Sequence, residues 1–272
     1  MGLRSPPLLT WRRLLEVRLL GTVEVLDDGG ATVSIGAPLL RTTLAALALR
    51  ARYIVPSSEL TDQIWGSRPP VTAGATMRNY IKRLRQLLPS NRIHTESGGY
   101  RLVADRSEID VERFRDMLQR SRELGRENLV EAAKTLDEAL TLWRGTPLTD
   151  LCDCPLRSFG QTRLEELYLT AVEERFAIGL ELGKHAEIVE DIMATGAIYC
   201  MRERLVHQLM TALYRCGRTV DALNVYRSTR ERMVEELGIE PGVNLRKLEQ
   251  AILKGDPALM VWRAAAECGT AV

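Results

Sequence analysis

The sequence predicts an α+β N-terminal winged helix-turn-helix followed by an all-α tetratricopeptide-like helical domain. Three observations predict this fold. Short strand patterns, three helix patterns and a glycine-centred hairpin follow one another over the first 105 residues. From Asp110 onward the apolar residues recur at helical spacing throughout. Two similar helix-turn-helix segments in that half lie 34 positions apart, which is the period of tetratricopeptide-type hairpins.

The first half of the chain is expected to form a small sheet, three helices and a wing. Strands are indicated by β-branched alternation, and helices by a proline or a capping residue at their start. In order, the expected elements are a strand at Glu16–Leu26, a turn at Asp27–Gly30, a returning strand at Ala31–Ile35, a helix at Pro38–Arg50, a helix at Glu59–Trp65 capped by Ser57 or Ser58, a third helix from its cap Thr72 to Leu88, and a hairpin of Arg92–Glu96 and Tyr100–Val103. This order is typical of a helix-turn-helix with a wing.

The third helix is the most informative segment. At 100° per residue, its apolar side chains Met77, Ile81, Leu84 and Leu88 share one side and face the core. The opposite side carries Thr76, Asn79, Arg83 and Gln86, flanked by Arg78, Lys82 and Arg85. Arg and Asn can form bidentate hydrogen bonds with base edges in the major groove, whereas flanking cations meet phosphates. The alternative is an ordinary solvated basic helix face.

The charge distribution favours nucleic acid as the partner of this half. Residues 1–105 contain 14 Lys and Arg and 8 Asp and Glu, whereas residues 106–272 contain 23 Lys and Arg and 28 Asp and Glu. The net charge of +1 is therefore the sum of a basic and an acidic half. No Asp or Glu occurs between Asp62 and Glu96. The hairpin that follows is the size of a wing on the DNA backbone, with Thr95, Ser97, Tyr100 and Arg101 as candidate phosphate contacts.

The second half is expected to be helical throughout. Its turns Leu180–Lys184 and Tyr214–Arg218 are the repeated pair. Such a domain usually offers a concave surface to a partner and holds no chemistry. The expected helices are Val111–Leu124 (capped by Asp110), Leu129–Trp143 (capped by Asn128), Arg157–Leu182, Ala186–Met193, Met201–Arg215, Thr219–Leu237 and Gly242–Leu253.

Several function classes are disfavoured by composition and motifs. The five cysteines include one CxC pair, Cys152 and Cys154, but no CxxC cluster, so reduced, packed thiols are favoured over a metal site. No Walker loop, GxGxxG, HExxH or GxSxG occurs, so we expect neither an enzyme nor a cofactor. No apolar run approaches the ~20 residues that cross a bilayer. Because charged residues also interrupt the apolar N-terminus before a signal-peptide core could form, we expect a cytoplasmic protein. DNA binding would make it nucleoid-associated.

An ordered set of motifs resembles a known family. These are V-R-L-L-G, L-T-D-Q-I-W-G-S-R-P-P, Y-I-K-R-L-R, S-G-G-Y-R-L, L-W-R-G-T-P-L-T-D-L, A-L-Y-R-C-G-R and E-L-G-I-E-P-G-V-N-L-R-K-L-E-Q-A-I-L. Over about residues 17–255 the chain looks like the Streptomyces antibiotic regulatory protein family, small-sized branch. The resemblance implies an OmpR/PhoB-type winged helix followed by a bacterial transcriptional activation domain. It also implies activation of a secondary-metabolite gene cluster, by binding direct repeats of double-stranded DNA near a promoter and recruiting RNA polymerase holoenzyme.

The resemblance also assigns residues and boundaries. Base-facing positions of the third helix fall on Thr76, Asn79 and Arg83, and phosphate contacts on Arg41, Arg78, Tyr80, Lys82, Arg85, Thr95 and Tyr100. The helical wheel places Tyr80 at the edge between core and DNA. The expected division is a tail at 1–16, the winged-helix DNA-binding domain at 17–105, the activation domain at 106–255 and a tail at 256–272. Direct repeats imply a second protomer bound head-to-tail.

The sequence departs from the family pattern at three places. The first helix begins with Pro38–Arg41, so only Arg41 is left there as a phosphate contact. The wing carries Glu96 and Ser97 where related wings often carry Arg. A segment that is usually rich in Pro and charge is replaced by Gly196–Met201, which includes Cys200. A rival hypothesis of another class is a helical-repeat adaptor whose basic domain docks on an acidic protein.

Overall fold

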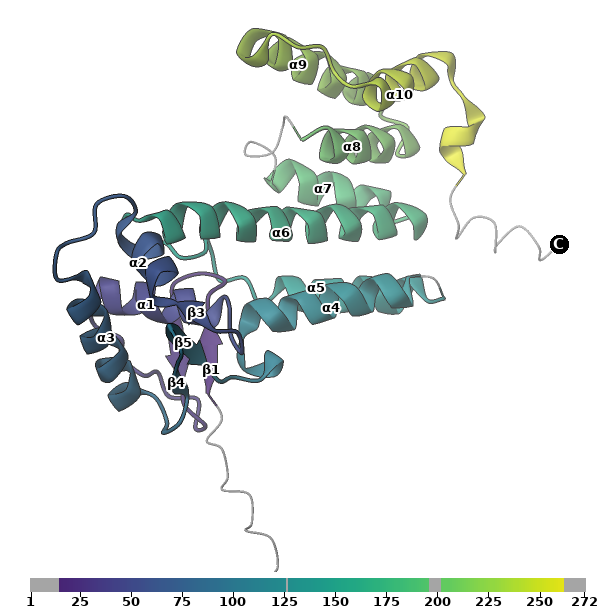
Figure 1. Ribbon diagram of the computed structural model, residues 1–272. Coiled ribbons are helices and arrows are strands. Elements are labelled where there is room, and N and C mark those ends of the chain that lie inside the picture. The colour runs from purple at the N-terminus through teal and green to yellow at the C-terminus, as the bar shows by residue number, and fades with distance from the viewer. Residues whose placement is uncertain (1–14, 126, 196–201, 262–272) are drawn as a thin grey trace, which may run out of the picture. The chain divides into compact units, whose positions relative to one another are not determined.

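The computed structural model describes residues 15–125, 127–195 and 202–261, and the chain divides into two compact units (Figure 1). One unit contains the residues up to Leu118 together with Glu138–Tyr168, and the other contains Gln119–Asp137 and the residues from Leu169 onward. The expected fold class is confirmed. The expected boundary between residues 105 and 106 stays a prediction, because helices α4 (Asp110–Leu124), α5 (Leu129–Leu140) and α6 (Pro155–Glu181) each contribute to both units.

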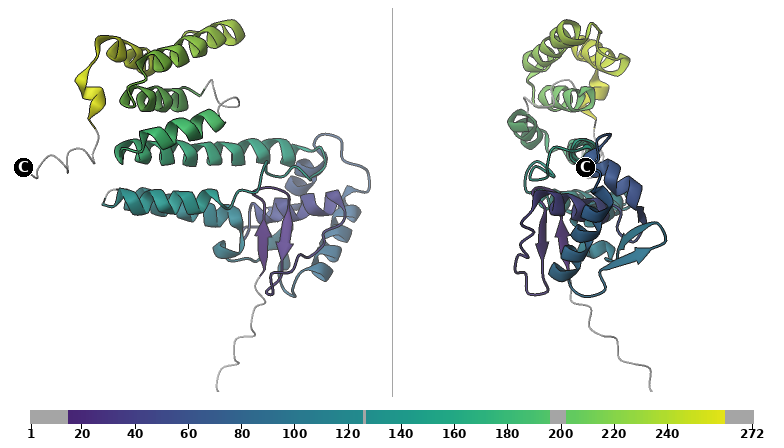
Figure 2. Two further views of the ribbon diagram at one scale, coloured as in Figure 1. Left: turned by 180° about the vertical axis from the view of Figure 1, so that it is seen from behind. Right: turned by 60° about the vertical axis from the view of Figure 1, so that its left-hand side comes forward.

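The part of the first unit that precedes α4 contains two small antiparallel sheets and the helices α1, α2 and α3. Strands β1 and β2 lie side by side in Figure 2, and the second sheet has the order β3-β5-β4. The elements are β1 (Glu16–Arg18), β2 (Glu24–Leu26), α1 (Pro38–Ala48), β3 (Val55–Pro56), α2 (Ser57–Trp65), α3 (Ala73–Leu87), β4 (Ile93–Glu96) and β5 (Gly99–Leu102). Helix α1 is the centre of this core: Leu40, Leu44 and Leu47 are at most 1% exposed, and the helix packs against both α2 and α3.

The segment expected as one strand at Glu16–Leu26 is two strands joined by a sharp turn. Hydrogen bonds to a distant carboxylate and one glycine conformation mark the break. The carboxylate of Asp110 accepts hydrogen bonds from the backbone N–H groups of Leu19 and Leu20 at 2.8 and 2.9 Å, and Gly21 has a φ of 144°. The expected returning strand at Ala31–Ile35 is reduced to a single bridge between Leu26 and Thr32. A partner far along the chain therefore overrides the local strand pattern.

Strand β3 was absent from the sequence-based expectation and closes the wing against the helices. Val55 pairs with Tyr100, and Pro56 with Gly99. A Cβ atom at Gly99 would lie 2.2 Å from the carbonyl oxygen of Val55, so the approach of these strands requires glycine. Two residues are too few to show alternation, which is why the sequence did not reveal this strand.

The helix starts in this unit differ from the expected caps. Helix α2 begins at Ser57 with Pro56 in the N-cap position, and neither Ser57 nor Ser58 caps it. Thr72 occupies the N-cap position of α3 but makes no side-chain cap hydrogen bond.

The expected extension of α5 to Trp143 is also wrong: the helix ends at Leu140, and Trp143 packs edge-on against Phe114 and Tyr168, with ring centroids 5.5 and 4.9 Å away.

The second unit repeats one helical hairpin geometry. Gly183 and Gly217 both have positive φ, 77° and 75°. After each glycine the next backbone N–H returns to a carbonyl five residues earlier, Lys184 to Gly179 and Arg218 to Leu213, both at 2.9 Å. This hydrogen bond is the Schellman closure of a helix. The 34-residue repeat therefore has a matched structural turn in each copy.

The remaining helices of the second unit pack in chain order, α7 on α8 and α8 on α9. Their bounds are α7 (His185–Thr195), α8 (Glu203–Arg215), α9 (Thr219–Leu237) and α10 (Val243–Lys254). Helix α9 has the expected bounds, with Gly238 in the left-handed conformation after it. The unusual segment Gly196–Met201, with Cys200, lies outside the described residues.

Candidate nucleic-acid interface

Helix α3 presents two sharply different faces. Its apolar positions Ala73, Met77, Ile81 and Leu84 are 7%, 1%, 1% and 0% exposed. They recur at intervals of three or four, so the sequence forms an amphipathic helix that is held by burial of this stripe against α1 and α2. The stripe fixes which residues point away from the core.

The outward face of α3 carries cations and amides that remain available. Arg78, Asn79, Lys82 and Arg83 are exposed, and within the part of the chain that the structure describes their side chains make no hydrogen bond or ion pair. Thr76 and Tyr80 are half-buried at the edges of this face. Since none of these cations forms an ion pair among the described residues, the face keeps its positive charge. The expected base-facing residues Asn79 and Arg83 thus share one exposed surface with Arg78 and Lys82.

The first turn of α3 adds a feature that the sequence analysis missed. Gly74 and Ala75 are both exposed in the first turn of the helix, where the N–H of Ala73 donates to the carbonyl oxygen of Pro70 at 2.9 Å. Their small side chains allow a ligand backbone to come close to the helix end. The signal for it was the Ala-Gly-Ala run directly after the expected cap Thr72.

Two of the expected phosphate contacts bind each other and join α3 to the wing. The guanidinium of Arg85 donates to the carbonyl oxygen of Ile93 at 3.0 Å and to the hydroxyl of Thr95 at 2.8 Å. Both residues remain exposed, so their outer atoms face solvent. In this structure they also set the position of β4 relative to α3.

The wing itself is less basic than its composition suggests. Arg101 lies 2.5 Å from Glu96 in an ion pair across the hairpin, which neutralises the only arginine on these two strands. Tyr100 is 9% exposed and faces Val55 and Thr95 in the sheet. Tyr100 is therefore mainly a packing residue, and Thr95 is the better placed of the two for a phosphate.

Arg41 has a different role from the expected phosphate contact. Its Nε atom lies 3.0 Å from a carboxylate oxygen of Asp150, and its Nη1 atom donates to the carbonyl oxygen of Ile35 at 3.0 Å. The same Asp150 accepts a hydrogen bond from the N–H of Val23 at 2.9 Å. Through these contacts Arg41 holds α1 against the segment around Asp150. Sequence spacing cannot reveal this partner, because it lies far along the chain.

Arg92, counted with the basic stretch, is also internal. It forms a bidentate pair with Glu108 at 2.6 and 2.8 Å, and both side chains are 4% exposed. Burial raises the pKa of Glu108, but the hydrogen bonds from Arg92 and from the backbone of Asp105 and Leu15 outweigh it, so the pKa lies below its ordinary value. Arg92 thus contributes to the fold and not to the outward charge.

The cysteine pair shows the surroundings of packed thiols. Cys154 is buried, and burial raises its pKa to about 11, which keeps the thiol protonated. Cys152 lies 3.3 Å from the hydroxyl of Thr42. Over the described residues no group of three or more His, Cys, Asp and Glu side chains could hold a metal ion, and no helix is long and apolar enough to span a membrane.

Comparison with known proteins identifies both halves of the chain. Residues 37–102 match the family described as transcriptional regulatory protein, C terminal, and residues 109–253 match the bacterial transcriptional activator domain. The regulatory protein DnrI of Streptomyces peucetius is 34% identical over 257 residues, covering 90% of this chain and 94% of DnrI. The regulatory protein AfsR of Streptomyces griseus is 38% identical over 259 residues, but the chain spans only 26% of its length.

A solved structure supports the same assignment. Mycobacterium tuberculosis EmbR, in complex with a low-affinity phosphopeptide, superposes with a TM-score of 0.86 at 28% identity, covering 95% of this chain and 70% of EmbR. EmbR is described as a transcriptional regulatory protein, and DnrI and AfsR as regulatory proteins. The chain therefore belongs to the Streptomyces antibiotic regulatory protein family, in which an OmpR/PhoB-type winged helix precedes a bacterial transcriptional activator domain.

Proposed function

We propose that this protein is a sequence-specific DNA-binding activator that reads direct repeats near the promoter of an antibiotic or secondary-metabolite gene cluster and recruits RNA polymerase. The observation that carries the proposal is the outward face of α3, where Asn79 and Arg83 are exposed beside Arg78 and Lys82 and have no carboxylate partner among the described residues. Arg and Asn can form bidentate bonds with guanine and adenine in the major groove. Thr76 lies at the edge of the same face and is the third base-facing position.

Phosphate binding supplies the rest of the affinity. Arg78, Lys82 and the outer atoms of Arg85 flank the base-facing positions, and Thr95 extends the contact onto the wing. Neutralising some six phosphates gives a log–log salt slope of about −5. Tyr80 is half-buried and Tyr100 mostly buried, so both are secondary candidates. Arg41 is left out, because Asp150 and Ile35 occupy its guanidinium.

The small reading surface favours the binding of a second protomer, and the direct orientation of the repeats is what the family resemblance implies. One short helix face contacts few base pairs, so a single winged helix binds weakly. Two protomers on adjacent repeats gain from each other's effective concentration. Because direct repeats share one orientation, the protomers bind head-to-tail and not about a two-fold axis.

The loop between α2 and α3, Gly66–Val71, is the proposed contact with RNA polymerase holoenzyme. Ser67, Arg68, Pro69 and Pro70 are exposed, and Val71 is fully exposed. This exposure leaves the loop accessible to a protein partner. Action on a promoter also implies a protein that works at the nucleoid in the cytoplasm.

Gel shifts with variants of the full chain test the proposal. The probes are a duplex selected from a random pool by the wild-type protein and a scrambled duplex of the same composition. Arg83→Ala is expected to abolish selective binding while leaving binding to scrambled DNA nearly intact. Lys82→Ala is expected to weaken binding to both duplexes alike, because a phosphate contact carries no sequence information. Arg227→Ala, an exposed arginine of α9, is the matched control.

The same experiment separates the DNA reader from the adaptor hypothesis. An adaptor that docks on an acidic protein would select no sequence from the pool. Equal losses on both duplexes for Arg83→Ala would refute base reading by that residue.

A further inference from the structure

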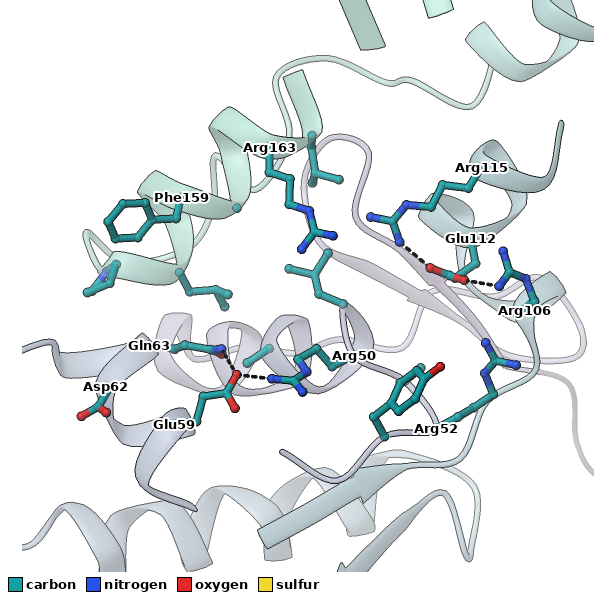
Figure 3. A pocket seen from close by; sticks show the side chains of 18 residues that line it. Arg50, Arg52, Glu59, Asp62, Gln63, Arg106, Glu112, Arg115, Phe159 and Arg163 are labelled. Atoms are coloured by element: carbon teal, nitrogen blue, oxygen red, sulfur yellow. Dashed lines mark hydrogen bonds and ion pairs between the residues drawn. The ribbon is translucent and has the colours of Figure 1, made fainter. Parts of the chain in front are cut away.

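A cleft in the first unit lies away from the outward face of α3. Its volume is about 940 Å³, and it is an open cleft lined by the end of α1 and the loop after it, by α2, and by the first turns of α4 and α6. Figure 3 shows these elements around the cleft. None of the exposed α3 residues Arg78, Asn79, Lys82 and Arg83 lines it. The volume falls within the ~300–1,000 Å³ of pockets that take small molecules.

Most of the charged residues that line the cleft are arginines. Five arginines face three carboxylates: Arg50, Arg52, Arg106, Arg115 and Arg163 against Glu59, Asp62 and Glu112. Two of these carboxylates are occupied, as the dashed lines in Figure 3 show. Glu112 lies 3.0 Å from Arg106 and 2.5 Å from Arg115, and Glu59 lies 2.5 Å from Arg50.

Two guanidinium groups of the cleft are left over. Arg52 and Arg163 are exposed, and in the described part of the chain their side chains make no hydrogen bond or ion pair. Arg163 extends from α6 into the space above α1, and Arg52 comes from the loop that follows α1 (Figure 3). Asp62 also lacks a side-chain partner among the described residues, so two free cations stand against one free anion.

Aromatic surface borders the same cleft. Phe159 is 78% exposed and Tyr53 is 64% exposed, and both line the cleft with Leu49 and Leu156. Aromatic rings with this exposure offer an apolar contact area that nothing in the described chain uses. A ligand with an apolar body can pack on them, while a free guanidinium takes its charged end.

From this combination we infer that the cleft binds a small organic anion, a carboxylate or a phosphate ester with an aromatic or aliphatic body. Guanidinium groups form paired hydrogen bonds with both kinds of oxyanion. Arg52 and Arg163 bind the anionic group, and Phe159 and Tyr53 bind the body. The site is independent of DNA binding, because its lining and the α3 face share no residue of those named for either role.

Titration of the full chain with 8-anilinonaphthalene-1-sulfonate, an aromatic anion whose fluorescence rises on binding, tests the site. The wild-type protein is expected to bind one molecule saturably. Arg52→Gln and Arg163→Gln are each expected to weaken binding by about tenfold, the loss of one charge-assisted hydrogen bond. Phe159→Ala is expected to weaken binding as well. Displacement by benzoate or by phenyl phosphate identifies which anionic group the cleft prefers.

The controls keep the result specific to the cleft. Arg227→Gln removes an exposed arginine of α9 and is expected to leave the affinity unchanged. Circular dichroism and the thermal midpoint establish that each variant is folded. We expect all of them to fold, because the substituted side chains are exposed. Absence of saturable binding, wild-type affinity in both cleft arginine variants, or an equal loss in Arg227→Gln would overturn the inference. None of these outcomes bears on the gel shifts of the α3 variants.

Discussion

Arginine serves opposite purposes in two regions of the molecule. One region is the outward face of α3, and the other is the buried pair of Arg92 and Glu108. Arg83 and Arg92 belong to one stretch without carboxylates, between Asp62 and Glu96. Arg83 is exposed and has no side-chain partner in the described chain, whereas Arg92 is 4% exposed and bound to Glu108. The difference arises because Glu108, from outside the stretch, reaches one arginine and not the other. A basic run in a sequence is therefore not yet a basic surface.

The buried pair also binds backbone groups next to the strands β1 and β5. Glu108 accepts hydrogen bonds from the backbone N–H of Leu15 at 3.2 Å and of Asp105 at 2.7 Å, in addition to the arginine. Arg92 donates further to the carbonyl oxygen of Val103 at 3.1 Å. Removal of either partner would leave the other charged and desolvated, so this pair contributes to the stability of the fold. The α3 face, in contrast, contributes to binding.

The largest expected effect follows from breaking the buried pair. Arg92→Ala leaves the Glu108 carboxylate buried without its counter-ion, and the free energy of unfolding should fall by about 3–5 kcal/mol. Urea denaturation followed by circular dichroism measures it. Arg83→Ala, which removes an exposed arginine, should change the same quantity by less than about 0.5 kcal/mol. Similar losses of unfolding free energy in both variants would contradict the different roles assigned to Arg92 and Arg83.

Acid should weaken the same pair. The folded state holds the pKa of Glu108 below its ordinary value of 4.5, so its stabilising contribution is complete above that pH and disappears as pH falls through the lowered pKa. The difference in unfolding free energy between the wild type and Glu108→Gln should therefore be constant near neutrality and shrink in acid. Urea titrations at a series of pH values provide the test. A difference that grows in acid would contradict the sign.

A smaller effect separates charge from geometry on α3. Arg83→Lys keeps the positive charge but loses the planar fork that forms two parallel hydrogen bonds. Binding to the selected duplex should weaken by about 1–3 kcal/mol, with binding to the scrambled duplex unchanged. Fluorescence anisotropy at fixed salt measures both affinities. Full retention of selectivity by the lysine variant would show that Arg83 acts only as a charge.

The sequence revealed much of the architecture because local periodicity is strong in the helices. The stripe of Met77, Ile81 and Leu84 on α3 and the bounds of α9 were expected and are observed. The 34-residue repeat was expected as well, and matching hydrogen bonds close its two turns. These features depend on residues within a few positions of each other, so their physics is contained in short windows of sequence.

The parts that sequence reasoning missed depend on distant partners. Asp110 breaks the expected first strand by binding Leu19 and Leu20, and the two-residue strand β3 exists only because β5 lies beside it. Arg41 was expected at a phosphate and is held by Asp150. No window of local sequence contains both members of these pairs.

The amino-acid order alone determined which residues of α3 face outward, the helical hairpins and the family, because helical spacing and ordered motifs are properties of the chain itself. Only the tertiary structure decided which arginines stay free. An arginine is neutralised by the nearest carboxylate in space, and Glu108, Asp150 and Glu96 reach Arg92, Arg41 and Arg101. The charge that remains on the surface is set by these pairings.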